Sequence, residues 1–203
     1  MKRFIKPLAH LIGLFPLARI VYAYFTSITF QINPIAEATH LTGWWALNIF
    51  VASLAVTPFS TVTGSRILAP WRKILGLYAF LYAFLHFSVF VGLDYFFDWK
   101  QIGDAIVEKP YVLVGFAAFV IMLVLAATSP DVAKRWLKKK WKPLHKSVYA
   151  AGILVAFHYI WLVKSDIRLP LVYLGVMLIL FVLRLPVVKT WFKDRRAASS
   201  TAS

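Results

Sequence analysis

The chain has 203 residues, of which 61% are hydrophobic and 15% charged, and its formal net charge is +15. Water-soluble domains usually carry about 25% charged residues, so this composition excludes an ordinary soluble domain and predicts a membrane protein. The basic residues fall in short clusters between apolar runs, which is typical of topology signals facing anionic lipid, so we expect membrane lipid and no nucleic acid as a partner. The chain has no cysteine, which excludes disulfides, thiolate-held iron–sulfur clusters and covalently attached haem.

Six apolar runs follow one another, each near the ~20 residues that cross a bilayer. Basic residues precede the first run as in a signal peptide, but no small-residue cleavage site follows it, so we expect a retained helix. The sequence predicts an all-α fold, a polytopic membrane bundle of six transmembrane helices that forms one domain over residues 1–196. A small polar tail over residues 197–203 is expected to be disordered. The predicted spans are residues 8–25, 44–59, 74–97, 111–128, 144–163 and 171–188.

The charged residues between the runs predict the orientation. Of the 23 basic residues, 18 lie before the first run, between the second and third, between the fourth and fifth, or near the C-terminal end. The opposite connections hold only Lys100, Lys109, Lys164 and Arg168, together with most of the acids. By the positive-inside rule the basic side faces the cytoplasm, so both termini are expected there, in a multi-pass bacterial inner membrane protein.

Two histidines lie deep in predicted spans that start on the same side of the membrane. His86 is 14 residues beyond Arg72, about 21 Å along a helix, and His158 is 16 residues beyond Lys142, about 24 Å. The two imidazoles therefore sit level. Ionisable residues inside a membrane are rare and usually functional, and a nitrogen donor in a dry apolar slot is what a haem site needs. We predict that His86 and His158 are the axial ligands of a haem that is held non-covalently.

A third histidine, His145, lies only three residues past Lys142, close to the basic surface. It is 13 residues from His158, about 20 Å along an unbroken helix, a separation that suits two stacked haems. An ideal helix would turn the two side chains about 140° apart, which argues against a shared face unless the helix is distorted near Gly152. His145 is thus a candidate metal ligand or propionate contact, and the haem count is one or two.

Other polar residues have two interpretations each. Arg19, midway along the first span, could neutralise a haem propionate or could snorkel to the surface. Arg72 could be a topology charge or could contact a flavin phosphate or a propionate. His40 could lie at the haem edge or at a partner surface, and His10 is expected only to hydrogen-bond a neighbouring helix.

The motifs also resemble a known family. Eight short stretches, spread in order along nearly the whole chain, are similar to the MsrQ (YedZ) family within the ferric-reductase-like transmembrane superfamily. They are HLTG (40–43), TP (57–58), RKILGL (72–77), H (86), KPY (109–111), TS (128–129), WKPLHKSVY (141–149) and HY (158–159). His86, His145 and His158 match the ligand positions of that family. One histidine rather than two stands on the third span, and the chain lacks the C-terminal FAD and NADPH module of the wider group.

The resemblance implies a function that composition does not reach. It implies a haem-binding membrane subunit that passes electrons from the quinone pool, with haem b and FMN as cofactors, to the periplasmic molybdopterin reductase MsrP. That reductase repairs methionine sulfoxide in periplasmic proteins, so the chain would be an electron-transfer subunit and not the catalytic one. Two alternatives stay open: a stand-alone metal or quinone reductase, and a non-redox transporter or structural membrane protein whose histidines only hydrogen-bond.

Overall fold

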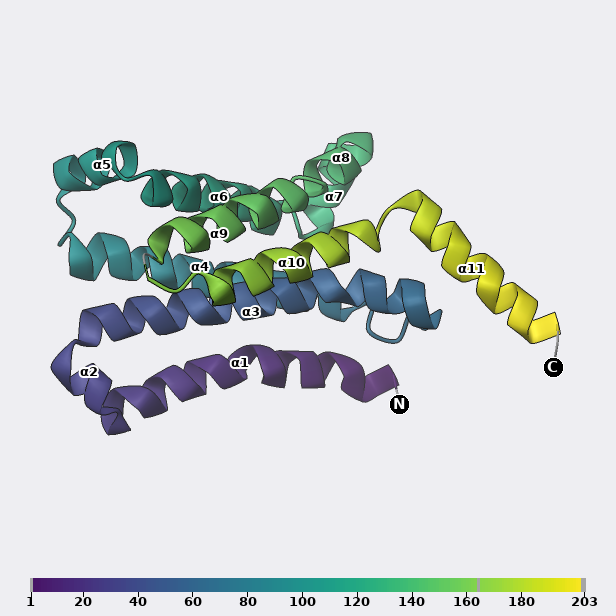
Figure 1. Ribbon diagram of the computed structural model, residues 1–203, viewed down its shortest axis with the longest axis horizontal. Coiled ribbons are helices and arrows are strands. Elements are labelled where there is room, and N and C mark those ends of the chain that lie inside the picture. The colour runs from purple at the N-terminus through teal and green to yellow at the C-terminus, as the bar shows by residue number, and fades with distance from the viewer. Residues whose placement is uncertain (1, 164, 202–203) are drawn as a thin grey trace.

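A computed structural model describes residues 2–163 and 165–201, and all regular structure in this part of the chain is helical (Figure 1). Lys164, at the end of the predicted fifth span, lies outside the described residues. The elements, in order, are α1 (Lys2–Thr26), α2 (Ile28–Ile32), α3 (Pro34–Thr63), α4 (Trp71–Val89), the π-helical turn η1 (Phe90–Asp94), α5 (Trp99–Glu108), α6 (Pro110–Ala127), α7 (Asp131–Leu137), the 3₁₀ turn η2 (Lys138–Lys140), α8 (Trp141–His145), α9 (Val148–Leu162), α10 (Arg168–Val182) and α11 (Pro186–Thr201).

Helix α3 is ten residues longer at its start than the predicted second span. Its first turn is built by Asn33, whose side-chain oxygen accepts a hydrogen bond from the backbone N–H of Ala36, and by Pro34 at the first helical position. It ends at Gly64, which adopts a left-handed φ of 75°. The apolar run alone did not include these cap signals, so the sequence prediction was too short at both ends.

The predicted third span ends in a distorted turn. Helix α4 passes into the π-helical turn η1, and Phe96 and Phe97 then adopt left-handed φ values of 46° and 60°. Asp98 caps the next helix, α5, by accepting from the backbone N–H groups of Lys100 and Gln101. The span therefore stops at Asp94 instead of Phe97, and α5 is an additional short helix on the connection.

The predicted fifth span is not one helix. Helix α8 ends at His145, and α9 begins at Val148. Between them the backbone N–H groups of Lys146 and Ser147 donate to carbonyls three residues back, at Pro143 and Leu144. The expectation of an unbroken helix over residues 144–163 was wrong, and the break lies at residues 146–147 instead of near Gly152. The 140° rotation derived for a straight helix therefore does not apply.

The last predicted span also bends. Helices α10 and α11 meet at an angle of 67°. At this bend the Arg184 guanidinium donates to the backbone carbonyl of Leu54, 2.6 Å away in α3. That carbonyl lacks its usual helical donor because the residue four positions later is Pro58. Helix α11 continues to Thr201, into the segment expected to be a disordered tail, and residues 202 and 203 lie outside the described part.

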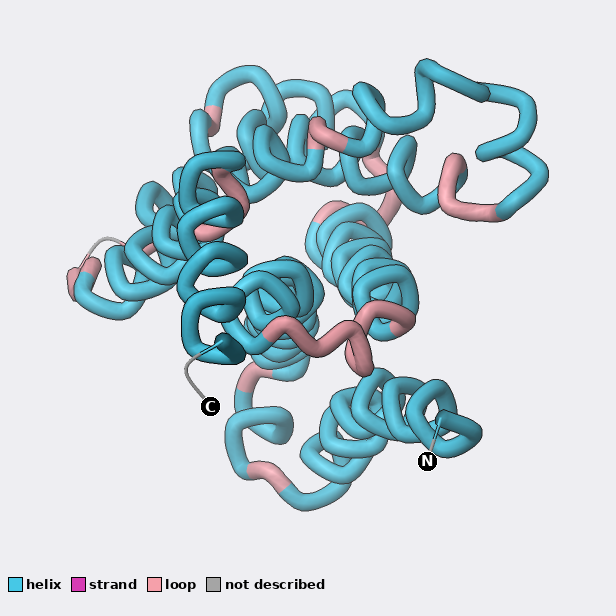
Figure 2. Tube along the Cα trace, turned by 90° about the vertical axis from the view of Figure 1, so that its right-hand side faces the viewer, coloured by secondary structure: helices cyan, strands magenta, loops and turns pink. Residues whose placement is uncertain are grey.

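The long helices lie along one axis and pack as two main pairs (Figures 1 and 2). Helix α3 packs most extensively on α4, and α6 on α9. Helix α1 covers α4 and α3, and α10 bridges α9 and α3. The core between them is almost entirely apolar, and its fully buried side chains include Tyr82 and Met177. This arrangement places α4 and α9 so that both run from the α8 end of the bundle toward the α5 end (Figure 1).

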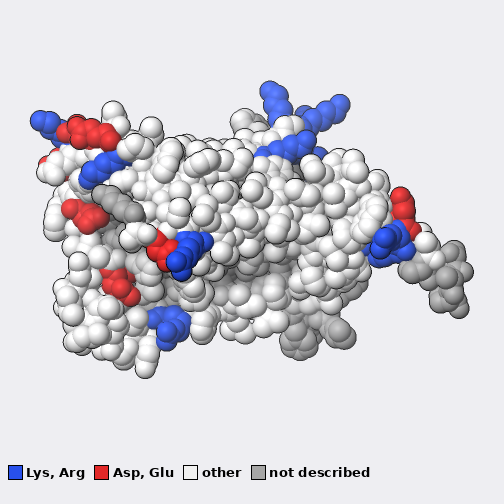
Figure 3. Space-filling view, viewed as in Figure 1, with Lys and Arg blue, Asp and Glu red and all other residues white. Residues whose placement is uncertain are grey.

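Charge separates the two ends of the bundle. In Figure 3 most of the visible acidic side chains gather at the end that carries α2 and α5. The N-terminus, the lysine-rich segment α7 to α8 and the start of α11 lie toward the opposite end (Figure 1). The asymmetry that the sequence predicts between alternate connections is therefore an asymmetry between two ends of one bundle.

The chain is a multi-pass membrane protein. Among the described residues, four helical segments are long and apolar enough to cross a membrane, and a fifth results if α10 and α11 count as one bent span. Helix α9, with 15 residues, is apolar but shorter. These four to five candidates are fewer than the six spans predicted from the apolar runs. The four segments are Ile5–Thr26, Pro34–Thr63, Trp71–Asp94 and Pro110–Ala127.

Candidate functional site

The side chains of His86 and His158 meet between the two helix pairs. Their ring centroids are 6.2 Å apart, and the ring planes make an angle of 81°. His86 comes from α4 and His158 from α9, so residues 72 positions apart in the sequence are neighbours in space. The prediction that the two imidazoles lie at one level is confirmed.

Each imidazole is held at Nδ1 by the helix that packs behind it. His86 Nδ1 lies 2.9 Å from the backbone carbonyl oxygen of Thr39 in α3, and His158 Nδ1 lies 2.6 Å from that of Tyr111 in α6. A carbonyl oxygen only accepts, so each Nδ1 carries the proton and donates it. In each neutral ring Nε2 is then left with a free lone pair, the form in which histidine binds a metal.

The spacing of the pair suits a metal ion held between the two rings. A metal–nitrogen bond is about 2 Å long, and the ring nitrogen lies about 1 Å from the ring centroid, so two imidazoles on opposite sides of one ion have centroids about 6 Å apart. The observed 6.2 Å agrees with this value. His86 and His158 therefore fit the axial positions of a haem iron, whose other four ligands belong to the porphyrin.

Aromatic side chains from η1 and α6 pack on Phe87, the residue that follows His86. Phe87 stacks on Phe119 with centroids 4.5 Å apart, and it also contacts Phe116 and Phe90. Phe84 is 48% exposed and faces outward. Phe157 is likewise exposed. The aromatic group therefore combines Phe87 and Phe90 with two phenylalanines of α6.

His145 is held in a different way, toward the basic end of the bundle. Its ring stacks on Trp141 with centroids 4.0 Å apart, and its Nε2 lies 3.1 Å from the Thr128 hydroxyl oxygen. That hydroxyl already donates to the Val124 carbonyl at 2.6 Å, so Nε2 of His145 is the donor in their contact.

The two candidate arginines lie in different places. The Arg72 side chain, at the start of α4, is exposed and contacts the Thr57 hydroxyl at 3.5 Å. Arg19 is exposed on α1, with its guanidinium 5.7 Å from the ring centroid of Tyr22 in the same helix. Arg72 thus lies toward the same end of the bundle as His145, and the outward position of Arg19 favours snorkelling over a propionate contact.

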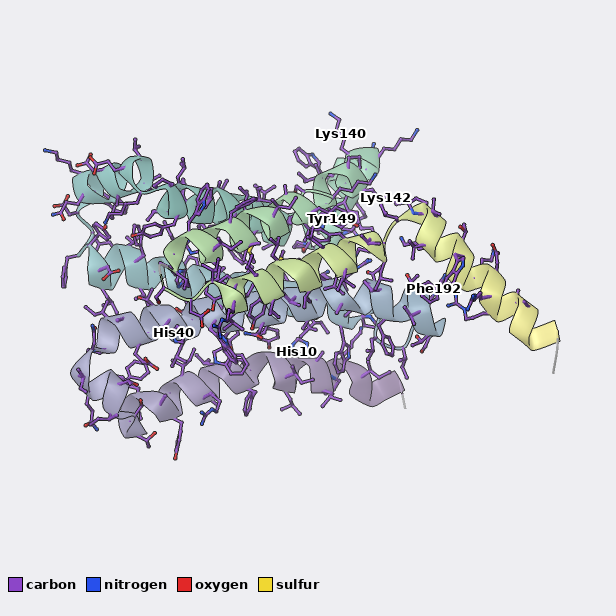
Figure 4. The ribbon with its side chains drawn as sticks, in the orientation of Figure 1. His10, His40, Lys140, Lys142, Tyr149 and Phe192 are labelled. Atoms are coloured by element: carbon purple, nitrogen blue, oxygen red, sulfur yellow. The ribbon has the colours of Figure 1, made fainter. Side chains whose placement is uncertain are left out.

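Two further histidines, His10 on α1 and His40 on α3, are labelled in Figure 4. His10 Nδ1 lies 3.2 Å from the Tyr78 hydroxyl of α4, which confirms the expected contact with a neighbouring helix. His40 is exposed on α3 and lines a shallow apolar pocket with Glu37 and Ala36. A role for His40 at the haem edge or at a partner surface stays a prediction.

Backbone groups complete the site, and sequence reasoning missed them. The carbonyls of Thr39 and Tyr111 orient the two rings, yet a carbonyl is present at every residue and carries no sequence signal. The only available signal is glycine, because Gly43 and Gly115 lie four residues after these carbonyls. Gly43 is the last residue of the HLTG stretch, whereas Gly115 lies in none of the stretches that resemble the family.

Comparison with known proteins gives one family and a set of relatives. Residues 42–156 match the family described as ferric reductase like transmembrane component. This stretch includes His86 and His145 and ends two residues before His158. No solved structure matches the chain.

Several curated relatives carry the name "Protein-methionine-sulfoxide reductase heme-binding subunit MsrQ". The relative from Bordetella pertussis (strain Tohama I) is 39% identical over 96% of this chain and 93% of its own length. That from Xanthomonas axonopodis pv. citri (strain 306) is 39% identical over 86% and 83%. That from Xanthomonas campestris pv. campestris (strain 8004) is 44% identical over 73% and 68%.

Proposed function

Because the chain belongs to the MsrQ family, within the ferric reductase like transmembrane component family, we propose that it is the haem-binding membrane subunit of a methionine sulfoxide reductase system. In this role it passes electrons across the membrane to a periplasmic molybdopterin reductase, MsrP, which reduces methionine sulfoxide in envelope proteins. The chain is the electron carrier of the complex, and the sulfoxide chemistry belongs to its partner.

The observation that carries the proposal is the histidine pair. His86 and His158 present two imidazoles 6.2 Å apart between centroids, each with Nδ1 bonded to a carbonyl and Nε2 free. When bound, haem b supplies a reversible one-electron couple at its iron. His86 and His158 would hold the haem through their Nε2 atoms, and a haem held by two imidazoles would suit electron transfer rather than oxygen chemistry.

The helices around the pair are apolar and rich in aromatic side chains. Phe87, the residue after His86, packs on Phe116 and Phe119 between α4 and α6, and both helices are apolar along their length. A dry, apolar shell controls the potential of a buried redox centre and limits access to it. The chain thus supplies binding, orientation and insulation, which are the tasks of a protein around a redox cofactor.

The basic end of the bundle is the proposed entry point for electrons. Arg72, at the start of α4, and His145, beside Thr128 and Trp141, both lie toward this end, and they offer cationic and hydrogen-bonding groups to an anionic cofactor group. We propose this region for the FMN phosphate or the propionates of a second haem, with electrons drawn from the quinone pool. Arg19 stays the weaker candidate for such a contact because its side chain faces outward.

The proposed topology has six spans in the bacterial inner membrane, with both termini in the cytoplasm. Support comes from the basic clusters at one end of the bundle and from the parallel course of α4 and α9. In this arrangement α9 is the fifth span. Its 15 residues extend about 22 Å, shorter than a hydrocarbon core of about 30 Å, so α9 would be completed by the adjoining segments or by local thinning.

The test is the absorption spectrum of the purified chain after reduction with dithionite. We expect the sharp bands of six-coordinate ferrous haem in the wild type and their loss in His86→Ala and in His158→Ala. His10→Ala is the matched control, because His10 is also a membrane histidine but contacts Tyr78 away from the pair. Full haem content in either of the first two variants would overturn the ligand assignment, and a wild-type chain without haem would overturn the function.

A further inference from the structure

Both histidines of the pair reach their carbonyls through the same backbone feature. The carbonyl bonded to His86 belongs to Thr39, and the residue four positions later is Gly43; the carbonyl bonded to His158 belongs to Tyr111, and Gly115 follows it by four. In a helix the Cβ of each residue tilts toward the N-terminus, over the turn before it. A side chain at position 43 or 115 would therefore stand over the carbonyl that the imidazole uses.

The distances show how closely the rings fill this space. A Cβ built on Gly43 would lie 3.0 Å from Nδ1 and from Cε1 of His86. A Cβ built on Gly115 would lie 2.5 Å from Nδ1 and 2.7 Å from Cε1 of His158. Non-bonded carbon and nitrogen atoms do not approach within 3.0 Å, so an alanine at 115 must displace the ring of His158. An alanine at 43 must push the ring of His86 by only a few tenths of an ångström.

A carbonyl oxygen inside a helix can take a second donor. Each carbonyl has two lone pairs, one of which accepts the helical N–H four residues on. The second is open to another group only where side chains leave it uncovered. We use the term glycine notch for the backbone surface at Gly43 and at Gly115, where the absent Cβ leaves the carbonyl four residues earlier open to an imidazole.

We propose that the two glycine notches position the pair for haem, by fixing the proton on Nδ1 and aiming each Nε2 at the space between α4 and α9. Gly43 and Gly115 are thus positioning residues, and they act through His86 and His158. A hydrogen bond from Nδ1 to a carbonyl makes an imidazole a more basic ligand, which favours ferric over ferrous iron. The notches therefore lower the potential of the bound haem as well as strengthening its binding.

The inference rests on the proposed function, and its test uses the full chain purified with its haem. The variants are Gly43→Ala and Gly115→Ala. The matched control is Gly175→Ala, because Gly175 lies within α10 and a Cβ there would meet nothing within 4 Å. Alanine favours a helix over glycine, so a purely helical effect would leave all three variants as stable as the wild type or more so.

The expected results are graded. Gly115→Ala should weaken haem binding about 10-fold to 100-fold, the usual loss when the partner of a metal-binding histidine is removed. Gly43→Ala should keep most of its haem but raise the midpoint potential and change the low-spin ferric EPR spectrum. A tenfold fall in the preference for ferric over ferrous iron corresponds to an upward shift of about 59 mV. Gly175→Ala should match the wild type in all three measurements.

The outcomes separate the two proposals. If the wild type binds haem and both notch variants match Gly175→Ala in affinity, potential and EPR spectrum, the positioning role is wrong and the proposed function stands. If the wild type binds no haem, the function fails first. Where Gly115→Ala does not accumulate, Gly43→Ala decides, because it requires a much smaller displacement; an unchanged potential and spectrum in that variant would overturn the inference.

Discussion

The orientation of the imidazoles of His86 and His158 is the most specific feature at the scale of single residues. The rings are separated by 6.2 Å and are close to perpendicular, at 81°. The orientation of each ring is set by its own hydrogen bond, because the two acceptors, Thr39 and Tyr111, lie on different helices. The two hydrogen bonds therefore fix the rotation of each ring, and with it the angle between the two ring planes.

This rotation predicts a spectroscopic signature. Perpendicular imidazoles leave two iron d orbitals nearly equal in energy, so the ferric protein should give a highly anisotropic low-spin EPR signal with one very large g value. Parallel rings would give an ordinary rhombic signal. The measurement is low-temperature EPR of the oxidised wild type. A rhombic spectrum from a fully loaded sample would contradict the ring orientation while leaving the ligand assignment untouched.

The sequence predicts residue roles unevenly. Counting along two helices from their basic ends was enough to place His86 and His158 at one level, because helix rise is constant. Nothing in the sequence indicated that Phe84 and Phe157 face outward while Phe116 and Phe119 are half-buried and pack on Phe87, since apolar residues all round a helix give no facial signal. Rotation about the helix axis depends on packing partners, which the chain does not display.

At the scale of elements, the bend between α10 and α11 is linked to a proline in α3. Pro58 removes the helical donor of the Leu54 carbonyl, and Arg184 supplies a replacement at 2.6 Å. The same guanidinium lies 5.5 Å from the ring centroid of Tyr149 in α9. One arginine thus joins three helices close to the bend.

Replacing Arg184 should therefore lower the stability more when Pro58 is present than when it is absent. Arg184→Met leaves the Leu54 carbonyl without a donor, and we expect a loss of about 1–3 kcal/mol in stability, read as a lower thermal midpoint. In a Pro58→Ala background the helix can supply its own N–H, so the same substitution should cost clearly less. Equal costs in the two backgrounds would show that Arg184 does not act through this carbonyl.

Helix α5 depends on its cap, Asp98. The carboxylate accepts from the backbone N–H groups of Lys100 and Gln101, and from the Gln101 side chain. These bonds, first of all that from the Gln101 backbone, lower the pKa of Asp98 below its usual value. A lowered pKa in the folded state means that the cap is fully effective above the unfolded value near 4 and is lost only as the pH falls through the folded value.

Asp98→Ala should consequently speed hydrogen exchange of the α5 amides at neutral pH, while Asp98→Asn, which can still cap, should have a small effect. Between pH 5 and 8 the difference in protection between the wild type and Asp98→Ala should stay constant. Hydrogen exchange followed by mass spectrometry of the α5 peptide is the measurement. A difference that fades within this pH range would mean that the carboxylate is not the capping group.

Element boundaries followed their own signals rather than hydropathy. Asn33 with Pro34, and Gly64, mark the ends of α3 in the sequence, but they lie outside the apolar run and were not used. The break between α8 and α9 has a weaker signal: Pro143 precedes it, yet no glycine or proline lies at residues 146–147. A run of apolar residues predicts that a helix exists, and caps predict where it stops.

For the whole molecule, the absence of cysteine from the sequence makes the proposed topology directly testable. A single cysteine at Asp104, in α5, should react with a membrane-impermeant maleimide in intact spheroplasts. A single cysteine at Lys139, in η2, should react only after the membrane is permeabilised. The cysteine-free wild type is the control for background labelling. The reverse pattern would invert the orientation, and labelling of both sites from outside would exclude an odd number of crossings between them.

The sequence predicted the fold class and the charge distribution of the molecule better than it predicted which helices pack on each other. An apolar, helical, multi-pass chain with basic clusters at one end follows from composition and from the spacing of the runs. The packing of α3 on α4 and of α6 on α9 does not follow from them, because in lipid the helices associate through shape and not through a hydrophobic stripe. The sequence therefore did not show that His86 and His158 meet between the two helix pairs.

Each of the two helix pairs builds its own arm of the site: α4 and α3 orient one imidazole, and α9 and α6 the other. Neither arm needs the opposite half in order to be set. An iron held by both would act as a crosslink between two modules that are already formed, so loading should tighten the docking of the modules and leave each one internally unchanged. Assembly of the holoprotein would then be the joining of two finished parts, with the cofactor as the last connection.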